Sequence, residues 1–322
     1  MAETPFHRIA MVGAGAIGGW AAARLALAGN SISVLARGTT LEALRSGGLH
    51  LTEQGETTVA SVTVDDDPSA LGKQDVVLVA VKAPALADAA KSARPLIGPD
   101  TLVVPMLNGV PWWFTGEPLQ SVDPDNRITQ VFPLEQVIGC VVHASCRRAA
   151  PNHVEVVQAE KLIVGDPGGG ASSRVASLCD LFERAGIRCE ASESIRSAIW
   201  YKLWGNATIN PLSALTRSTA DKLLDDPVIR GFMAEAMDEL AAIGAAIGCP
   251  IGETAEDRLA VTARLGAFKS SMLQDVEAGR PIELEALLGA PREIAARAGI
   301  ATPQLDRIYA MTRLLGGNLG PP

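Results

Sequence analysis

Two patterns of hydrophobic and polar positions divide the chain. Up to about residue 192, short apolar runs bounded by Gly, Pro and Asn alternate with longer segments of helical period, as in proteins that alternate strands and helices. The pattern predicts a hairpin over 48–64 turning near Gln54 and Gly55. It also predicts helices up to Ala28 and over 84–94 and 173–185, and strands at 8–12, 31–36, 75–81, 101–107, 137–145, 154–158, 161–164 and 187–191.

The part after Ser192 contains no convincing strand. Pro and Gly breakers separate its helical segments, which we expect at 195–209, 227–247, 254–277, 282–298 and 303–315. The sequence therefore predicts an α/β domain over residues 1–192, followed by an all-helical domain over residues 193–322.

A glycine-rich turn follows the first predicted strand and opens the first predicted helix. Its sequence is Gly13-Ala14-Gly15-Ala16-Ile17-Gly18, a GxGxxG pattern with the correct element on each side. Gly13 suits the tight turn, Gly15 lets the backbone approach a pyrophosphate, and Gly18 lets the helix pack closely on the strand. This setting favours a Rossmann-type dinucleotide-binding domain over an incidental glycine-rich turn.

Three polar residues end the predicted strands of this domain. Arg37 stands where NAD-binding domains usually carry Asp or Glu, and its guanidinium suits the 2′-phosphate of NADP; alternatively it caps a solvated strand end. Lys82 and Asn108 end the next two strands, where ligands of open α/β sheets bind. A surface lysine and an ordinary Asn-Gly turn are the competing interpretations of these two residues.

Lys202, Asn206 and Asn210 recur every four residues on a helix that is apolar nearly all round. An ammonium and two amides in such surroundings need partners, because burying an unpaired polar group costs free energy. We expect these side chains to line a cleft that binds a ligand, with a structural polar network as the alternative. Further along, Ser271 shares a helix face with Asp275, and either Glu283 or Glu285 opens the next helix.

The composition argues against several classes of protein. With 322 residues, 48% hydrophobic residues and a net charge of −8, the chain has material for two cores and no basic surface for nucleic acid. It shows no signal peptide and no apolar run of membrane-spanning length, and its five scattered cysteines form no disulfide or zinc pattern. We expect a cytoplasmic protein without a bound metal, a nucleic-acid partner or a membrane association.

The ordered set of motifs resembles the ketopantoate reductase (2-dehydropantoate 2-reductase) family over nearly the whole chain. The least specific pieces are GAGAIG at 13–18, Arg37, VK at 81–82 and NG at 108–109. The most specific are KLWGNATINPLSAL at 202–215, KSSMLQD at 269–275 and GRPIELE at 279–285. Ile282 stands where the family usually has Thr.

The resemblance implies NADPH as the hydride donor, a 2-keto acid as the substrate, and a site between an N-terminal Rossmann domain and a helical C-terminal domain. It implies Lys202 as the general acid on the keto oxygen, a positioned ammonium that both stabilises and protonates the developing alkoxide. Glu283 rather than Glu285 aligns with the family's glutamate. Substrate would be held by Asn108, Asn206, Asn210, Ser271 and Glu283, and cofactor by Gly13, Gly15, Ala16, Ile17, Gly18, Arg37, Lys82 and Asn108. A homodimer is compatible with the family.

Residues 111–127 form a loop that is longer than in compact members of this family, and it carries Trp112, Trp113 and Phe114. These aromatics either roof a pocket or fill a hydrophobic gap. Three functions therefore compete: reduction of ketopantoate to pantoate for pantothenate and coenzyme A synthesis, reduction of a different and bulkier 2-keto acid, and sensing of NADP(H) without turnover. The Lys202, Asn206, Asn210 and Glu283 set argues against a sensor, which needs no proton donor.

Overall fold

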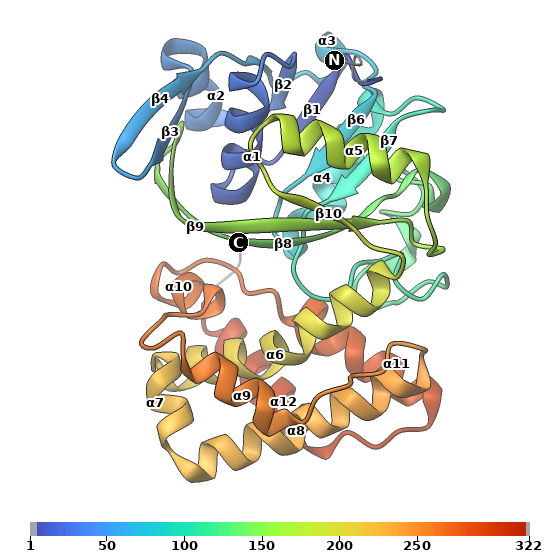
Figure 1. Cartoon of the computed structure of the whole chain (residues 1–322), viewed down its shortest axis with the longest axis vertical. Helices are drawn as coiled ribbons and strands as arrows, with labels where there is room; N and C mark the ends of the chain where they lie inside the picture. The colour runs from blue at the N-terminus through green and yellow to red at the C-terminus, as the bar shows by residue number, and fades with distance from the viewer. Residues whose placement is uncertain (1–4, 320–322) are drawn as a thin grey trace. The chain divides into compact units, whose positions relative to one another are not determined.

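The computed structural model describes residues 5–319 and divides into two compact units (Figure 1). Unit 1 comprises the chain up to Leu107 together with Asp125–Arg196, and unit 2 comprises Asn108–Pro124 and the chain from Ser197 onward. Unit 1 is α/β and unit 2 is helical, which confirms the predicted fold class. The boundaries differ from those expected at 192/193, because residues 108–124 group with the helical unit and not with the α/β unit.

The first sheet of unit 1 is entirely parallel, with strand order β5-β2-β1-β6-β7. All residues of β1 and β6 are buried, which agrees with the continuous apolar runs typical of parallel strands covered on both faces. The strands are β1 (Ile9–Val12), β2 (Ile32–Leu35), β5 (Thr63–Asp65), β6 (Val76–Val79) and β7 (Leu102–Pro105). Helices of this part are α2 (Gly38–Gly47), α3 (Pro68–Leu71) and α4 (Leu86–Ala93), with short 3-10 turns η1 (Ala83–Ala85) and η2 (Arg94–Leu96).

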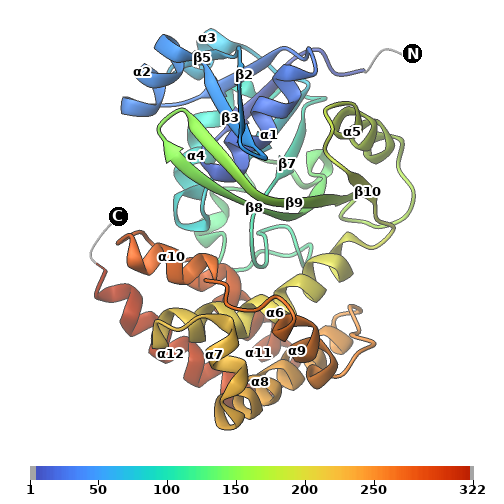
Figure 2. The same ribbon diagram turned by 60° about the vertical axis from the view of Figure 1, so that its left-hand side comes forward.

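The second sheet has the order β10-β9-β3-β4, and β8 pairs with β9 in a long antiparallel ribbon (Figure 2). The predicted hairpin is present, since Gln54 and Gly55 both have positive φ and connect two antiparallel strands. The elements are β3 (Leu49–Glu53), β4 (Glu56–Ala60), β8 (Gly139–Ala150), β9 (His153–Gly165) and β10 (Cys189–Ala191), with α5 (Ser173–Arg184), η3 (Pro124–Asn126) and η4 (Leu134–Gln136).

The two short strands predicted at 154–158 and 161–164 are a single strand, β9. The residues between them belong to a bulge, because His143 pairs with Lys161 while the next residue, Ala144, pairs with Ala159. One extra residue, Glu160, is thus accommodated without ending the strand.

Helix α1 (Ala16–Leu27) contacts both sheets of unit 1. Its small residues permit this close packing: a Cβ on Gly19 would lie 2.6 Å from Val154 Cγ2 of β9. Trp20 and Leu25 of the same helix are buried in the shared core.

Unit 2 is built around α6, whose indole groups connect it to α8. Trp200 donates a hydrogen bond to Leu240 O (3.0 Å) and Trp204 donates one to Met237 O (2.8 Å). The helices are α6 (Ile195–Thr216), α7 (Ala220–Asp225), α8 (Pro227–Ala246), α9 (Ala255–Ala263), α10 (Ser271–Glu277), the π-helical turn η5 (Glu285–Gly289), α11 (Ala290–Ala298) and α12 (Pro303–Gly317).

Three helix predictions in unit 2 need correction. Helix α6 continues through Pro211 to Thr216, because burial of Leu212 and Ala214 offsets the cost of a proline inside a helix. The short helix α7 was not expected. The single helix predicted over 254–277 is two helices, since Gly266 adopts φ +68° and Ser270 then caps α10 by accepting a hydrogen bond from Leu273 N.

Candidate functional site

A cavity of about 490 Å³ lies in unit 1 at the carboxyl ends of β1, β2 and β6. This is the place where open α/β sheets bind nucleotides. Four predicted cofactor residues line it: Gly13, Gly15, Arg37 and Lys82. Ala16, Ile17 and Gly18 belong to the first turn of α1 and are not part of the lining, and the predicted cofactor residue Asn108 belongs to unit 2.

The three glycines of the GxGxxG turn are required for different reasons. Gly13 has φ +98°, and a Cβ there would lie 2.7 Å from Val81 Cγ1, while a Cβ on Gly18 would lie 2.1 Å from Gly13 O. A Cβ on Gly15, in contrast, would have Ala80 O as its nearest neighbour, at 4.0 Å. Protein packing therefore explains the first and third glycines and leaves space at the second, as expected where a pyrophosphate approaches the backbone. The cavity fits a dinucleotide.

The cavity carries three cationic side chains and one carboxylate. Arg37 follows β2 and donates a hydrogen bond from Nη2 to Ser92 Oγ on α4 (2.6 Å). Arg148, on β8, donates from Nη2 to Thr40 Oγ1 of α2 (2.6 Å), and Lys82 precedes η1. Asp88 on α4 is the carboxylate in the lining. The excess of positive charge suits the phosphates of a dinucleotide.

In unit 2, residues far apart in sequence form a continuous polar chain. The ammonium of Lys202 donates a hydrogen bond to Asn108 Oδ1 (3.1 Å), and Asn108 Nδ2 in turn lies 3.4 Å from Glu283 Oε2. An ammonium on one side and a carboxylate on the other fix the orientation of the amide. Lys202 is half-buried and Glu283 is buried, so these hydrogen bonds are partly shielded from bulk water.

Glu283 and Glu285, which local sequence could not separate, have different partners. Glu285 accepts a hydrogen bond from the Tyr309 hydroxyl (2.9 Å), while Glu283 joins Asn108. Glu283 lies immediately before the helical segment that starts at Leu284, not inside it. Of these two carboxylates, Glu283 is therefore the one connected to Lys202.

The remaining predicted substrate residues are placed differently. Asn206 and Asn210 follow Lys202 at four-residue steps along α6, with Asn210 buried. Ser271 is exposed, whereas Asp275 on the same helix is buried and pairs with Arg280. The preceding serine, Ser270, is buried and its Oγ lies 3.4 Å from Asn210 O. Ser270 is the N-cap of α10. The sequence analysis placed this residue inside a longer helix and therefore did not single it out.

Asn108 is held in unit 2 by the residues that follow it. Gly109 has φ +79°, and a Cβ there would lie 2.4 Å from Ala286 O. Val110 N then donates a hydrogen bond to the same carbonyl (2.8 Å). This close approach to η5 explains why glycine follows Asn108.

The three loop aromatics are buried, which favours the interpretation that they fill a hydrophobic gap. Trp112, Trp113 and Phe114 are 2%, 3% and 1% exposed. The Phe114 ring stacks on Trp200, with centroids 5.8 Å apart and an interplanar angle of 27°. The loop is therefore packed against α6, the helix that also carries Lys202.

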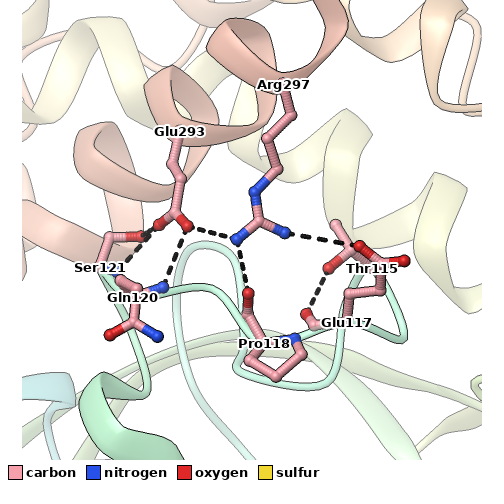
Figure 3. Close-up of polar contacts among 7 residues, drawn as sticks. All are labelled: Thr115, Glu117, Pro118, Gln120, Ser121, Glu293 and Arg297. Atoms are coloured by element: carbon pink, nitrogen blue, oxygen red, sulfur yellow. Dashed lines mark hydrogen bonds and ion pairs between the residues drawn. The ribbon is translucent and has the colours of Figure 1, made fainter.

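A carboxylate on α11 holds the far end of this loop (Figure 3). Glu293 accepts hydrogen bonds from Gln120 N (3.0 Å), Ser121 N (2.9 Å) and Ser121 Oγ (2.7 Å). Arg297, one helical turn later, donates to Glu293 Oε1 and to Pro118 O, both at 2.6 Å. Partial burial raises the pKa of Glu293, but the hydrogen bonds from Ser121, Gln120 and Arg297 outweigh it and lower the pKa below its usual value. Glu293 was not predicted from the sequence because Gln120 and Ser121 lie 173 and 172 positions away and two of its donors are their backbone amides.

Two further findings bear on the kind of protein. Within residues 5–319, no three His, Cys, Asp or Glu side chains gather in a group that could hold a metal ion. The same described part of the chain contains no helix with the length and apolar character needed to cross a bilayer.

Comparison with known proteins gives matches across the chain. The family model described as "Ketopantoate reductase PanE/ApbA" matches residues 9–169, and the model "Ketopantoate reductase PanE/ApbA C terminal" matches residues 194–316. The 2-dehydropantoate 2-reductase of Mesorhizobium japonicum is 40% identical over 324 aligned positions, which cover 97% of this chain and 99% of the relative.

Solved structures agree with these matches. A protein of Ralstonia solanacearum MolK2, provisionally named a ketopantoate reductase, is 51% identical and superposes with a TM-score of 0.94 over 97% of this chain and 98% of its own. The 2-dehydropantoate 2-reductase of Methylococcus capsulatus is 31% identical, with a TM-score of 0.85 and 98% of each chain covered.

Proposed function

Because the chain belongs to the ketopantoate reductase family and is therefore an oxidoreductase, we propose that it uses NADPH to reduce a 2-keto acid to a 2-hydroxy acid. The substrate that we favour is 2-dehydropantoate (ketopantoate), giving pantoate for pantothenate and coenzyme A synthesis in the cytoplasm. A homodimer stays a prediction.

The polar chain of Lys202, Asn108 and Glu283 carries this proposal. Reduction of a ketone places negative charge on its oxygen, and the reaction needs a group that stabilises this charge and supplies a proton. Lys202 is our general acid: its Nζ carries the proton, and the hydrogen bond to Asn108 (3.1 Å) fixes the position of the ammonium. Glu283 orients Asn108 by accepting a hydrogen bond from its Nδ2 atom.

The cofactor proposal rests on the cavity of unit 1. When bound, NADPH supplies the hydride that adds to the carbonyl carbon of the substrate. Gly13 and Gly15 would accommodate its pyrophosphate, Lys82 would contribute positive charge, and Arg37 would bind the 2′-phosphate. The absence of an acidic residue at the end of β2 favours NADPH over NADH.

Substrate binding is proposed for polar side chains of unit 2. Asn206 and Asn210 share the helix of Lys202, and their amides suit the carboxylate and hydroxyl groups of a hydroxylated keto acid. Glu283 would accept a hydrogen bond from a substrate hydroxyl, and Ser271 completes the set predicted from the family motif.

The two alternatives are less well supported. The argument for a bulkier 2-keto acid rested on Trp112, Trp113 and Phe114, and these rings are buried, which leaves them little surface for contact with a substrate. A sensor without turnover does not need a proton donor, whereas Lys202 is held in place by an amide that is itself oriented by a carboxylate.

The proposed function is tested by following NADPH oxidation with ketopantoate, beside NADH and a panel of other 2-keto acids. We expect turnover of ketopantoate with kcat/KM of about 10⁴ M⁻¹s⁻¹ or more, and a clear preference for NADPH. Faster turnover of a bulkier keto acid would change the substrate and keep the mechanism. If no keto acid in the panel were reduced, the enzymatic proposal itself would fail.

A further inference from the structure

The cavity of unit 1 contains a second arginine that sequence analysis did not identify. We propose that Arg148 binds the 2′-phosphate of NADPH together with Arg37, and that the two guanidinium groups set the preference for NADPH over NADH. The inference rests on the proposed cofactor and assigns to it a residue from β8, outside the βαβ unit that contains Arg37.

The position of Arg148 relative to Arg37 supports this assignment. Arg37 immediately precedes α2, and Thr40 belongs to the first turn of the same helix. The Nη2 atom of Arg148 lies 2.6 Å from Thr40 Oγ1, so the guanidinium reaches the start of α2, and both arginines line the same cavity. Both arginines therefore face the space at the end of β2, where a Rossmann fold holds the ribose.

Both guanidinium groups are available to an anion. Among the residues that the structure describes, neither Arg37 nor Arg148 pairs with a carboxylate; their partners are the Ser92 and Thr40 hydroxyls and the Pro151 carbonyl. A guanidinium has five N–H donors, and in each arginine these hydrogen bonds involve only Nη2. The remaining donors suit a phosphate, which carries nearly two negative charges at neutral pH.

The neighbouring residue provides a contrast. Arg147 precedes Arg148 on β8, and successive side chains of a strand point to opposite faces. Its guanidinium pairs with Glu155, and it is not part of the cavity lining. An Arg147→Ala variant thus removes the same charge from the same strand without touching the proposed phosphate site.

A structural role for Arg148 must be separated from ligand binding, because it also donates to Pro151 O in the turn between β8 and β9 (3.1 Å). If Arg148 had only a structural role, its loss would weaken the binding of all nucleotides to the same extent. If Arg148 binds the 2′-phosphate, its loss would weaken the binding only of nucleotides that carry this group.

Isothermal titration calorimetry distinguishes these cases with four ligands: NADPH, NADH, adenosine 2′,5′-bisphosphate and ADP. For Arg148→Ala we expect Kd to rise about tenfold for NADPH and the bisphosphate, and less than about twofold for NADH and ADP. Arg148→Lys should recover part of the loss, and Arg147→Ala should match the wild type. Thermal unfolding checks that each variant is folded.

Three outcomes would overturn the inference. Equal weakening of ADP and adenosine 2′,5′-bisphosphate by Arg148→Ala would assign Arg148 to the turn. If Arg37→Ala lost NADPH binding while Arg148→Ala behaved like Arg147→Ala, NADPH would remain the cofactor and Arg148 would have no part in binding it. A wild-type protein that bound NADH as tightly as NADPH would refute both this inference and the NADPH proposal.

Discussion

Asn108 Oδ1 lies 3.1 Å from Lys202 Nζ, although the two residues are 94 positions apart in the chain. The contact forms within unit 2, because Gly109 and Val110 hold this segment against Ala286. The amide that positions the proposed proton donor is thus fixed by backbone packing and by Glu283.

Replacing Asn108 with Ala should therefore impair the chemical step. Without the amide oxygen the ammonium of Lys202 loses an oriented partner, and we expect kcat to fall about tenfold to a hundredfold. The Kd of NADPH, measured by titration calorimetry, should change less than about threefold, because the cofactor cavity belongs to unit 1. Unchanged kcat together with much weaker NADPH binding would contradict this role and assign Asn108 to the cofactor.

Lys202→Met removes the proposed general acid and keeps a long side chain. We expect kcat to decrease by about 10²- to 10⁴-fold, the usual range for a lost acid, with NADPH binding preserved. Lys222→Met, an exposed lysine on α7, is the matched control and should leave kcat unchanged. If kcat of Lys202→Met stayed within threefold of the wild type, another group would have to donate the proton.

The glycine-rich turn gives a prediction that separates ligand binding from packing. Gly15→Ala should weaken NADPH binding about tenfold or more while leaving the melting temperature nearly unchanged, since its Cβ meets no protein atom closer than 4.0 Å. Gly18→Ala should instead lower the free energy of unfolding by about 1–3 kcal/mol, because its Cβ would overlap Gly13 O. Calorimetric titration and chemical denaturation measure the two effects, and identical behaviour of the two variants would refute the distinction.

Glu293 and Ser121 should be energetically coupled. Glu293→Ala leaves the Gln120 and Ser121 amides without their acceptor, and we expect a loss of about 1–3 kcal/mol in the free energy of unfolding. In a double-mutant cycle of Glu293→Gln and Ser121→Ala, the coupling should be about 0.5 kcal/mol or more. If the two substitutions had additive effects on the free energy of unfolding, Glu293 and Ser121 would not be coupled.

The same carboxylate predicts a pH dependence. Its pKa is lower in the folded protein than in the unfolded chain, so the unfolded state binds more protons at low pH. The contribution of Glu293 to stability is fully present above the usual glutamate pKa of about 4.3 and is lost as the pH falls through the lower folded value. Urea unfolding at several pH values should show the difference between the wild type and Glu293→Gln shrinking only below about pH 4.3. A difference that grows on acidification would reverse the sign of the shift.

Local signals in the sequence were sufficient for much of the fold. The GxGxxG turn and the continuous apolar runs of β1 and β6 identify a parallel sheet, because buried strands and tight turns require particular residue types at fixed positions. The regular spacing of Lys202, Asn206 and Asn210 similarly placed three polar groups along α6. Each of these signals comes from residues that are close together in the sequence, within one or two helices or strands.

Two features that the sequence did not reveal depend on residues that are distant in the chain. Trp112 and Phe114 look equally suited to a pocket or a core until Trp200 is seen beside Phe114. Arg148 has no local motif, and its contact with Thr40 on α2 joins residues that are 108 positions apart. Local signals were also overlooked: Gly266 and Ser270 end one helix and start another within the segment expected to be a single helix.

The assignment of residues 108–124 to unit 2 has a consequence for how the protein can be divided. The chain changes unit three times, after Leu107, after Pro124 and after Arg196, so no single cut separates the two parts. A fragment starting at residue 193 would lack Phe114, which covers Trp200, and Asn108, the hydrogen-bond partner of Lys202. The helices of unit 2 therefore cannot be exchanged alone: a recombinant or hybrid protein that exchanges them must also exchange residues 108–124, which lie in sequence between two segments of unit 1.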